Sequence, residues 1–136
     1  MKESGDRVIG PSGEVKPTSP QEDLRIRTKN FALRILRLFQ SLPNRTDVPV
    51  LGRQLLRSGT SVGANYRAAG RARSKAEFVA KIGIVLEEAD ETVFWLELLQ
   101  ECGAIKPELL QELRREANEP TAIFAAAHRT ARNRKP

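Results

Sequence analysis

The 136-residue chain has little of the chemistry on which most catalytic and metal sites depend. It contains one cysteine and one histidine, so neither a disulfide framework nor a zinc site of Cys and His ligands can form within it. Aromatic residues make up only 5%, which disfavours a surface that stacks the bases of single strands. No apolar run approaches the roughly 18 residues of a membrane span, and residues 1–17 lack the apolar segment of a signal peptide. We therefore expect a cytoplasmic protein without a cofactor, a metal or a membrane contact.

What the chain does contain is typical of one globular domain. Hydrophobic residues make up 40% and charged residues 29% of a length that suits a single domain. Residues 1–23 are rich in Gly, Pro, Ser and charge and carry no periodic apolar face, so we predict a disordered N-terminal tail there. The domain itself is predicted to span residues 24–132.

Apolar residues recur in alternating steps of three and four along nearly all of that domain, which is the spacing of a helix with one buried face. The first such series is Leu24, Thr28, Phe31, Ile35, Leu38 and Leu42. The predicted helices span about 24–42, 48–70, 75–102 and 107–131. Because short loops place consecutive helices antiparallel, the sequence predicts an all-α, up-down four-helix bundle. Pro120 lacks a helical N–H and predicts a kink near 120 in the last helix.

The ends of the predicted helices carry signals of their own. Asp47 is a candidate N-cap for the second helix, and Ser74 with Glu77 has the spacing of a capping box before the third. Gly103 is a candidate C-cap for the third helix.

Four glycines lie on one face of the second predicted helix: Gly52, Gly59, Gly63 and Gly70. Each glycine costs a helix roughly 1 kcal/mol relative to alanine, so a stripe of them needs a compensating contact. We interpret the stripe as a place where another backbone approaches closely. A groove open to a ligand phosphate is the alternative.

Charge is divided unevenly along a chain whose formal net charge is +6. Residues 24–73 hold eleven basic residues and one acid, whereas residues 74–105 hold two basic residues and seven acids. One interpretation is a basic surface that meets phosphates. The other is that the basic helices pair with the acidic helix, within a subunit or between subunits. The acids are too few to neutralise every basic residue, so we expect some positive surface to stay free.

Two motifs that suggest enzyme chemistry have simpler interpretations. Residues 59–63 match the G-x-S-x-G pattern of hydrolases, but that pattern requires a strand before the serine and a positioned histidine. Here it lies within a helical pattern, so Ser58, Ser61 and Asn65 are better interpreted as polar groups at a helix contact. The acids within residues 87–91 lack the paired Glu-x-x-His motifs of a di-iron bundle. We predict no catalytic residues and no metal ligands.

The third predicted helix has a second apolar line, formed by Ile84, Trp95, Leu98 and Cys102. A helix that is apolar on two sides is buried on two sides, and in a small bundle the second side often meets another subunit. We therefore expect a homo-oligomer.

The middle of the chain resembles a known family. The runs QLLRSGTSVGANYRAA at 54–69 and RARSKAEFVAKIGIVLEEADETVFWLELL at 71–99 are similar to bacterial four-helix bundle proteins first met in intervening sequences of 23S ribosomal RNA genes. The residues that fall where the family signature has them are Gln54, Arg57, Ser58, Ser61, Ala64, Asn65, Glu77, Phe78, Glu91, Trp95 and Leu96.

This resemblance implies a ring-shaped homopentamer of four-helix bundles with no catalytic residues. The family is similar in turn to the accessory variability determinant of diversity-generating retroelements, a basic pentamer that binds nucleic acid and a reverse transcriptase. Two residues depart from the family pattern. Ala68 stands where a Glu is usual, and Pro120 stands where an apolar residue commonly continues the last helix.

The leading hypothesis is a non-enzymatic, oligomeric scaffold that binds structured RNA or duplex DNA through its phosphates, with a reverse transcriptase or another protein as a candidate partner. The alternative is a protein–protein adaptor that uses its charges in subunit and partner contacts and binds no nucleic acid. The candidate nucleic-acid contacts are Arg27, Arg34, Arg53, Arg67, Arg71 and Arg73. The candidate subunit contacts are Ser58, Ser61, Asn65, Glu91 and Trp95.

Overall fold

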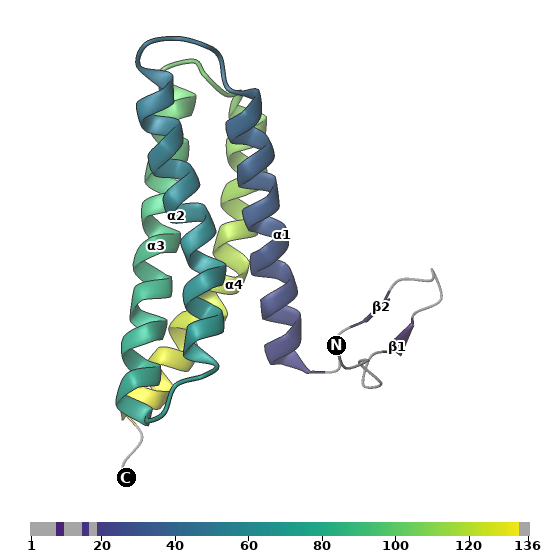
Figure 1. The fold of residues 1–136 in the computed structure, drawn as a ribbon, viewed down its shortest axis with the longest axis vertical. Helices are drawn as coiled ribbons and strands as arrows, with labels where there is room; N and C mark the ends of the chain where they lie inside the picture. Colours follow the sequence, from purple (N-terminus) through teal and green to yellow (C-terminus); the bar gives the residue numbers. More distant parts are fainter. Residues whose placement is uncertain (1–7, 10–14, 17–18, 134–136) are drawn as a thin grey trace.

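A computed structural model describes residues 8–9, 15–16 and 19–133 of the chain. Four helices follow one another: α1 (Pro20–Ser41), α2 (Val48–Ala69), α3 (Lys75–Glu101) and α4 (Pro107–Asn133). Consecutive helices run antiparallel, so the α2–α3 loop lies at the same end of the bundle as the start of α1 and the end of α4 (Figure 1). We call this the lower end and the opposite end the upper end. The predicted all-α four-helix bundle is confirmed.

The helix ends follow the local sequence signals at most positions. Ser19 and Ser74 cap α1 and α3 by accepting a hydrogen bond from the N–H three residues further on, at 3.1 and 3.0 Å. Gly103 follows α3 with a φ of +85°, the left-handed conformation that suits glycine after a helix. Asp47 stands at the N-cap of α2 but makes no capping bond, because Arg45 holds its carboxylate at 2.9 Å.

The structure corrects the predicted boundary between tail and domain. Helix α1 begins at Pro20 because Ser19 supplies its N-cap, so residues 20–23 are helical and do not belong to a disordered tail. Within the rest of the predicted tail, β1 (Val8–Ile9) and β2 (Val15–Lys16) pair as two short antiparallel strands. The other residues of the predicted tail lie outside the described residues.

Three glycines of α2 bring α1 into close contact with it. A Cβ on Gly59 would lie 2.9 Å from the side chain of Ile35, and one on Gly52 would lie 2.8 Å from a leucine methyl at the end of α1. At Gly63 the nearest atom would be a carbonyl oxygen of α1 at 3.4 Å. Helix α1 therefore packs closely at all three positions, but the predicted approach of another backbone is confirmed only at Gly63, because Gly52 and Gly59 meet side chains. The fourth glycine, Gly70, meets no neighbouring helix.

The core consists of two apolar clusters stacked along the bundle. The upper cluster contains Phe31, Ile35, Leu38, Val48, Leu55, Leu96, Leu99, Ile105, Leu110, Leu113 and Ala117. The lower cluster contains Leu24, Val62, Tyr66, Ala69, Ile82, Val85, Ala89 and Phe124. Two fully buried hydroxyls also join α2 to α3, because the Ser58 and Thr92 oxygens lie 2.9 Å apart. Each is also within hydrogen-bond distance of a carbonyl of its own helix, so neither is left unpaired.

Helix α4 runs through Pro120 without a break. Pro120 is buried and has no N–H to offer the carbonyl one turn earlier, so the hydrogen-bond ladder is interrupted at one point. Just after it, the Thr121 hydroxyl donates to the carbonyl of Ala117. Figure 1 shows the half of α4 after this point leaning away from α1 toward the start of α3. Helix α1 consequently touches α4 far less than it touches α2.

Candidate nucleic-acid interface

The structure separates the eleven basic residues of positions 24–73 into paired and unpaired groups. Those that form ion pairs are Arg27, Arg34, Arg45 and Arg57. Those with no ion pair inside the described part of the chain are Arg25, Lys29, Arg37, Arg53, Arg67, Arg71 and Arg73. Pairing within the subunit is therefore confirmed for four of these residues, although only Arg57 pairs with the acidic helix α3. Contact of the others with phosphates stays a prediction.

Arg27 and Arg34 of α1 form ion pairs with glutamates of α4. The Nη2 atom of Arg27 lies 3.0 Å from Oε1 of Glu119. The Nη2 atom of Arg34 lies 2.9 Å from Oε1 of Glu112, and its Nη1 pairs with Glu116. Exposed pairs of this kind contribute about 0–1 kcal/mol each to stability, but they neutralise both guanidinium groups. The structure thus corrects the expectation that these two arginines present free charge to a phosphate.

Arg57 is held by the acidic helix. Its Nη1 lies 3.1 Å from Oε1 of Glu88, and its Nη2 pairs with Glu91, whose carboxylate also accepts a hydrogen bond from the indole N–H of Trp95 at 2.9 Å. The bond from Trp95 and then the pairing with Arg57 lower the pKa of Glu91. The same carboxylates, Glu91 first, raise the pKa of Arg57. The charges of these three side chains on the α2–α3 surface are therefore balanced by ion pairs within the subunit.

Four cations that have no ion pair in the described part of the chain gather at the lower end: Arg25, Lys29, Arg67 and Arg71, which we call the basic cluster. Arg25, Lys29 and Arg67 line a hollow of about 310 Å³ beside α1. Arg25, Arg67 and Arg71 line a second, larger cleft of about 520 Å³. All four residues are exposed, and the negative end of the α2 dipole lies close to Arg67 and Arg71. One acid, Glu22, lines the first hollow, and none lines the second.

The other predicted nucleic-acid contacts lie at opposite ends of α2. Arg73 is exposed in the α2–α3 loop, two residues after the last member of the basic cluster. Its backbone N–H donates to Oε1 of Glu77 at 2.8 Å, which anchors the loop to the start of α3. Arg53 is exposed near the start of α2, about 21 Å along the helix axis from Arg67. The structure therefore brings Arg67 and Arg71 together and leaves Arg53 apart.

Two members of the basic cluster are absent from the predicted contacts. Arg25 and Lys29 lie one helical turn apart on α1, outside the buried series that starts at Leu24 and Thr28. That spacing puts both side chains on one exposed face, and it is the signal in the sequence that identifies them. The spacing does not show which helix lies beside this face, because that depends on how α1 packs on α2.

Three of the predicted subunit contacts are polar residues of α2. Ser58 is fully buried inside the subunit against Thr92, so its side chain cannot touch another subunit, and the structure corrects this assignment. The Ser61 hydroxyl donates to the carbonyl of Arg57 at 2.7 Å, and the Asn65 amide donates to the carbonyl of Ser61 at 2.9 Å. Both side chains thus form hydrogen bonds within their own helix, and both remain partly exposed.

The remaining two predicted subunit contacts, Glu91 and Trp95, adjoin an exposed apolar residue. Phe94 is 50% exposed, and its ring centroid lies 5.0 Å from that of Trp95 in an edge-on arrangement. Trp95 itself is half-buried and fixed by its bond to Glu91. An exposed phenylalanine beside a fixed tryptophan favours a contact with another protein surface.

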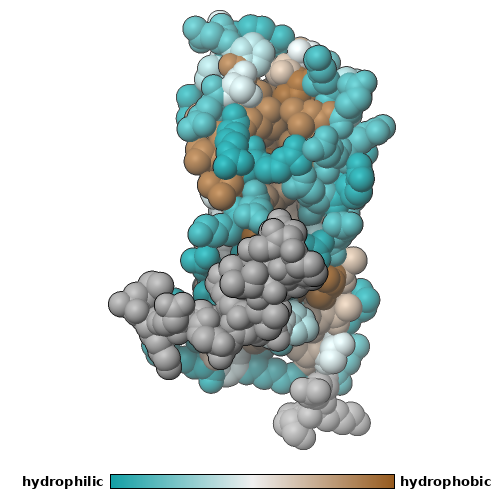
Figure 2. Space-filling view, turned by 90° about the vertical axis from the view of Figure 1, so that its right-hand side faces the viewer, coloured by the Kyte–Doolittle hydropathy of each residue, from teal (hydrophilic) through white to brown (hydrophobic). Residues whose placement is uncertain are grey.

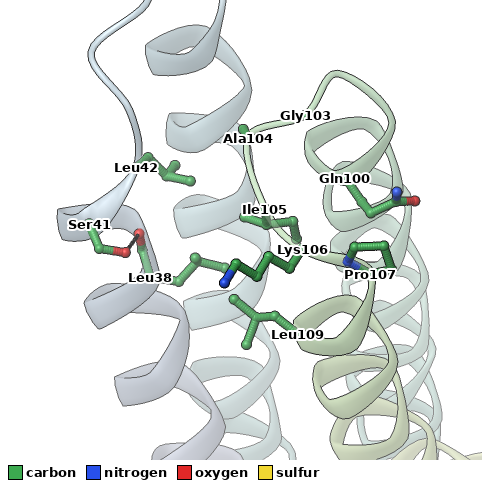
Figure 3. A pocket seen from close by; sticks show the side chains of 10 residues that line it. All are labelled: Leu38, Ser41, Leu42, Gln100, Gly103, Ala104, Ile105, Lys106, Pro107 and Leu109. Carbon is green, nitrogen blue, oxygen red and sulfur yellow. Dashed lines mark hydrogen bonds between the residues drawn. The ribbon is translucent and has the colours of Figure 1, made fainter.

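An apolar hollow of about 580 Å³ opens at the upper end, where α1 faces the α3–α4 loop. Figure 3 shows Leu38, Leu42, Ile105 and Leu109 around it, with the Lys106 side chain reaching across toward Leu38. Figure 2 shows an apolar surface near the upper end of this face, with hydrophilic side chains below it. The lining of the hollow is mainly apolar, and its polar side chains are Ser41, Gln100 and Lys106.

Within residues 8–9, 15–16 and 19–133, no group of three or more His, Cys, Asp or Glu side chains is placed to hold a metal ion. None of the helices in this part of the chain is both long and apolar enough to span a membrane.

Known proteins share this arrangement of helices. Residues 22–126 match the family model of the 23S rRNA-intervening sequence protein. The chain belongs to this family. It is also similar to the crystal structure of a protein with unknown function from the S23 ribosomal protein family of Bacteroides thetaiotaomicron VPI-5482, with 36% sequence identity and a TM-score of 0.76. That match covers 81% of this chain and 98% of the other. No curated protein matches the chain.

The family match confirms the resemblance that the sequence of the middle helices predicts. In this member of the 23S rRNA-intervening sequence protein family, the segment that matches the family model starts in the first turn of α1 and ends in α4 beyond Pro120. The whole basic cluster lies inside that segment. The cluster therefore lies within the part of the chain that the family model covers.

Proposed function

We propose that this protein is a non-enzymatic, oligomeric scaffold that binds structured RNA or duplex DNA through its phosphates. The observation that carries the proposal is the basic cluster at the lower end. It consists of four exposed cations from α1, α2 and the following loop, and none of them has an ion pair in the described part of the chain. Neutralisation of phosphates by such side chains releases counterions, which supplies the sequence-independent part of nucleic-acid affinity.

Phosphate contacts fit this surface better than contacts with bases. The guanidinium group presents a planar fork of donors that matches phosphate oxygens, and three of the four cations are arginines. Of the three aromatic rings that line the larger cleft, Tyr66 and Phe124 are only 9% and 1% exposed and cannot stack on bases, which leaves the half-buried Phe78. We therefore expect binding that depends on shape and charge and reads little sequence.

Assembly into a homo-oligomer would repeat the cluster around a common axis. The family resemblance suggests a ring-shaped pentamer, and the exposed Phe94 beside Trp95 supplies an apolar patch for subunit contact. Several copies bound to one nucleic acid gain avidity through effective concentration, so a modest cluster suffices in each subunit. Such a scaffold works in the cytoplasm. The similarity to the accessory variability determinant makes a reverse transcriptase a candidate partner.

The test is a fluorescence-anisotropy titration of nucleic-acid-free protein with a duplex DNA and an RNA hairpin at several salt concentrations. We expect log K to fall linearly with log salt, with a slope of about 0.9 per neutralised phosphate on the duplex. The variant Arg67→Glu/Arg71→Glu should bind at least about tenfold more weakly at low salt. Absence of binding by the native protein at low salt would refute the proposal.

The matched control changes charge by the same amount away from the cluster. Lys106 precedes α4 at the upper end, and Arg115 is exposed on α4. The variant Lys106→Glu/Arg115→Glu should retain nearly the affinity of the native protein. An equal loss in both double variants would show that net charge, and not the cluster, governs binding.

A protein–protein adaptor is the second candidate, and the exposed apolar side chains of α2 and α3 favour it. Val50 is 55% exposed and Phe94 is 50% exposed. If these residues contact other subunits, Phe94→Ser should lower the mass that light scattering measures, with the helix content retained. An adaptor would show this change together with no nucleic-acid binding at low salt.

A further inference from the structure

The larger cleft at the lower end has the form of a small-molecule site. Its volume is about 520 Å³, within the usual range of ligand pockets, and it opens between the start of α1, the end of α2, the start of α3 and the lower half of α4. Its apolar lining consists of Leu24, Tyr66, Phe78, Ile82, Ile123 and Phe124.

The space in the cleft has two structural sources. Gly70 and Ala127 lie in its lining but contribute little or no side chain to fill it. After Pro120, the lower half of α4 leans toward the start of α3, so α4 covers α1 only in part at this end (Figure 1). An apolar cleft consequently opens at the lower end, in addition to the apolar hollow at the upper end.

Among the described residues that line the cleft, every charged side chain is positive. Arg25, Arg67 and Arg71 line it, no acid does, and none of the three arginines has an ion pair within the described residues. The Tyr66 hydroxyl donates to the backbone carbonyl of Gln21 at 3.4 Å. Burial raises the pKa of Tyr66, so this hydroxyl stays neutral and adds no negative charge. An apolar interior thus adjoins a cationic rim.

We propose that this cleft binds a small amphipathic anion, namely an acyl or alkyl chain of medium length that ends in a carboxylate or a phosphate. The hydrocarbon chain gains from leaving water for the apolar lining, and the anionic head forms charge-assisted hydrogen bonds with the arginines. A nucleotide base fits this lining poorly, because its polar edge would lose hydrogen bonds to water. Apart from the arginines, the lining offers it only Gln21 and the Tyr66 hydroxyl, which is already bonded.

This proposal does not depend on the proposed nucleic-acid binding, since it requires no polymer. The two ligands share Arg25, Arg67 and Arg71, so an amphiphile in the cleft and nucleic acid on the basic cluster should compete. A substitution that fills the cleft without changing charge separates them, because it removes amphiphile binding and leaves nucleic-acid binding in place.

The experiment uses the full chain, with 8-anilinonaphthalene-1-sulfonate as a fluorescent probe of the same amphipathic chemistry. The probe should fluoresce on binding, and sodium decanoate should displace it at concentrations below micelle formation. Each CH₂ added from hexanoate to decanoate should tighten binding by about fourfold. Decanol, which has the same chain length without the charge, should bind about tenfold more weakly than decanoate.

Substitutions locate the binding within the cleft. Ala127→Phe fills the cleft and should abolish displacement, whereas Ala122→Phe, at an exposed position outside the lining, should leave it unchanged. Arg67→Gln/Arg71→Gln should weaken decanoate binding by about tenfold and leave decanol unaffected. The proposal is overturned if the native chain does not bind the probe, if decanoate and decanol bind equally, or if folded Ala127→Phe protein binds as the native chain does.

Discussion

Gly59 faces Ile35 so closely that a Cβ on the glycine would lie 2.9 Å from two carbons of the isoleucine side chain. Ile35 is fully buried, so it has little room to move away. We expect Gly59→Ala to lower the free energy of unfolding by about 1–2 kcal/mol, since overpacking outweighs the roughly 1 kcal/mol gained in helix propensity. Urea unfolding followed by circular dichroism measures the change.

The matched control for this substitution is Gly70→Ala. Gly70 ends α2 where no neighbouring helix would meet a Cβ, and its backbone is in the right-handed helical region. The free energy of unfolding should therefore stay the same or rise by up to about 1 kcal/mol. A Gly59→Ala protein as stable as the Gly70→Ala protein would contradict the close contact of α1 with α2.

The buried hydroxyl pair between α2 and α3 should behave as one unit. Thr92→Val removes one partner of the Ser58 hydroxyl, and we expect a loss of about 1 kcal/mol in the free energy of unfolding. Ser58→Ala should cost less in the Thr92→Val background than in the native protein, because its partner is already gone. A double-mutant cycle measures the difference. Strictly additive losses would argue against the bond.

Charge reversal at Arg34 should loosen the contact between α1 and α4. Arg34→Glu places a carboxylate beside Glu112 and Glu116, and we expect a loss of up to about 1 kcal/mol in stability that shrinks at high salt. Arg37→Glu, which has no ion pair in the described part of the chain, is the control. Nucleic-acid affinity should fall less than in the Arg67→Glu/Arg71→Glu variant. An equal fall would mean that Arg34 belongs to the nucleic-acid interface.

Acid should release the Trp95 side chain from Glu91. The hydrogen bond from Trp95 and the pairing with Arg57 lower the pKa of Glu91 in the folded protein. Its contribution to stability is therefore fully present above the ordinary glutamate pKa of about 4.3 and is lost as the pH falls through the lowered folded-state pKa. Trp95 is the single tryptophan, so its emission should change below about pH 4. The transition should be absent from Glu91→Gln protein, and its persistence there would assign it to another group.

Most helix positions could be predicted from the sequence because their determinants are local. The series from Leu24 to Leu38 is buried as its spacing predicts, and Ser74 caps α3 as its neighbours indicate. The start of α1 was harder to predict, because Pro20 is followed by three polar residues and none of the four adds to the apolar series. Their helical state depends on the cap that Ser19 supplies.

The candidate site was only partly predictable. Arg67 and Arg71 belong to the basic cluster as the charge count suggests, but Arg25 and Lys29 join them because of the way α1 packs on α2. Ser58 shows the same limit, since its position on α2 is clear from the sequence but its burial depends on α3. Spacing along one helix states which residues share a face, and it does not state what lies opposite that face.

The sequence by itself determined four helices, their order and the glycine stripe on one face of α2, because periodicity, capping and side-chain size act over a few residues. That α1 lies against this stripe came from the structure. Only the tertiary structure decided which positive charges are free. Arg34 and Arg37 stand three residues apart on α1, yet Arg34 pairs with α4 and Arg37 has no ion pair within the described residues. The physical reason is that a charge is neutralised by a neighbour within a few ångströms, and that neighbour comes from a helix more than seventy residues further along the chain.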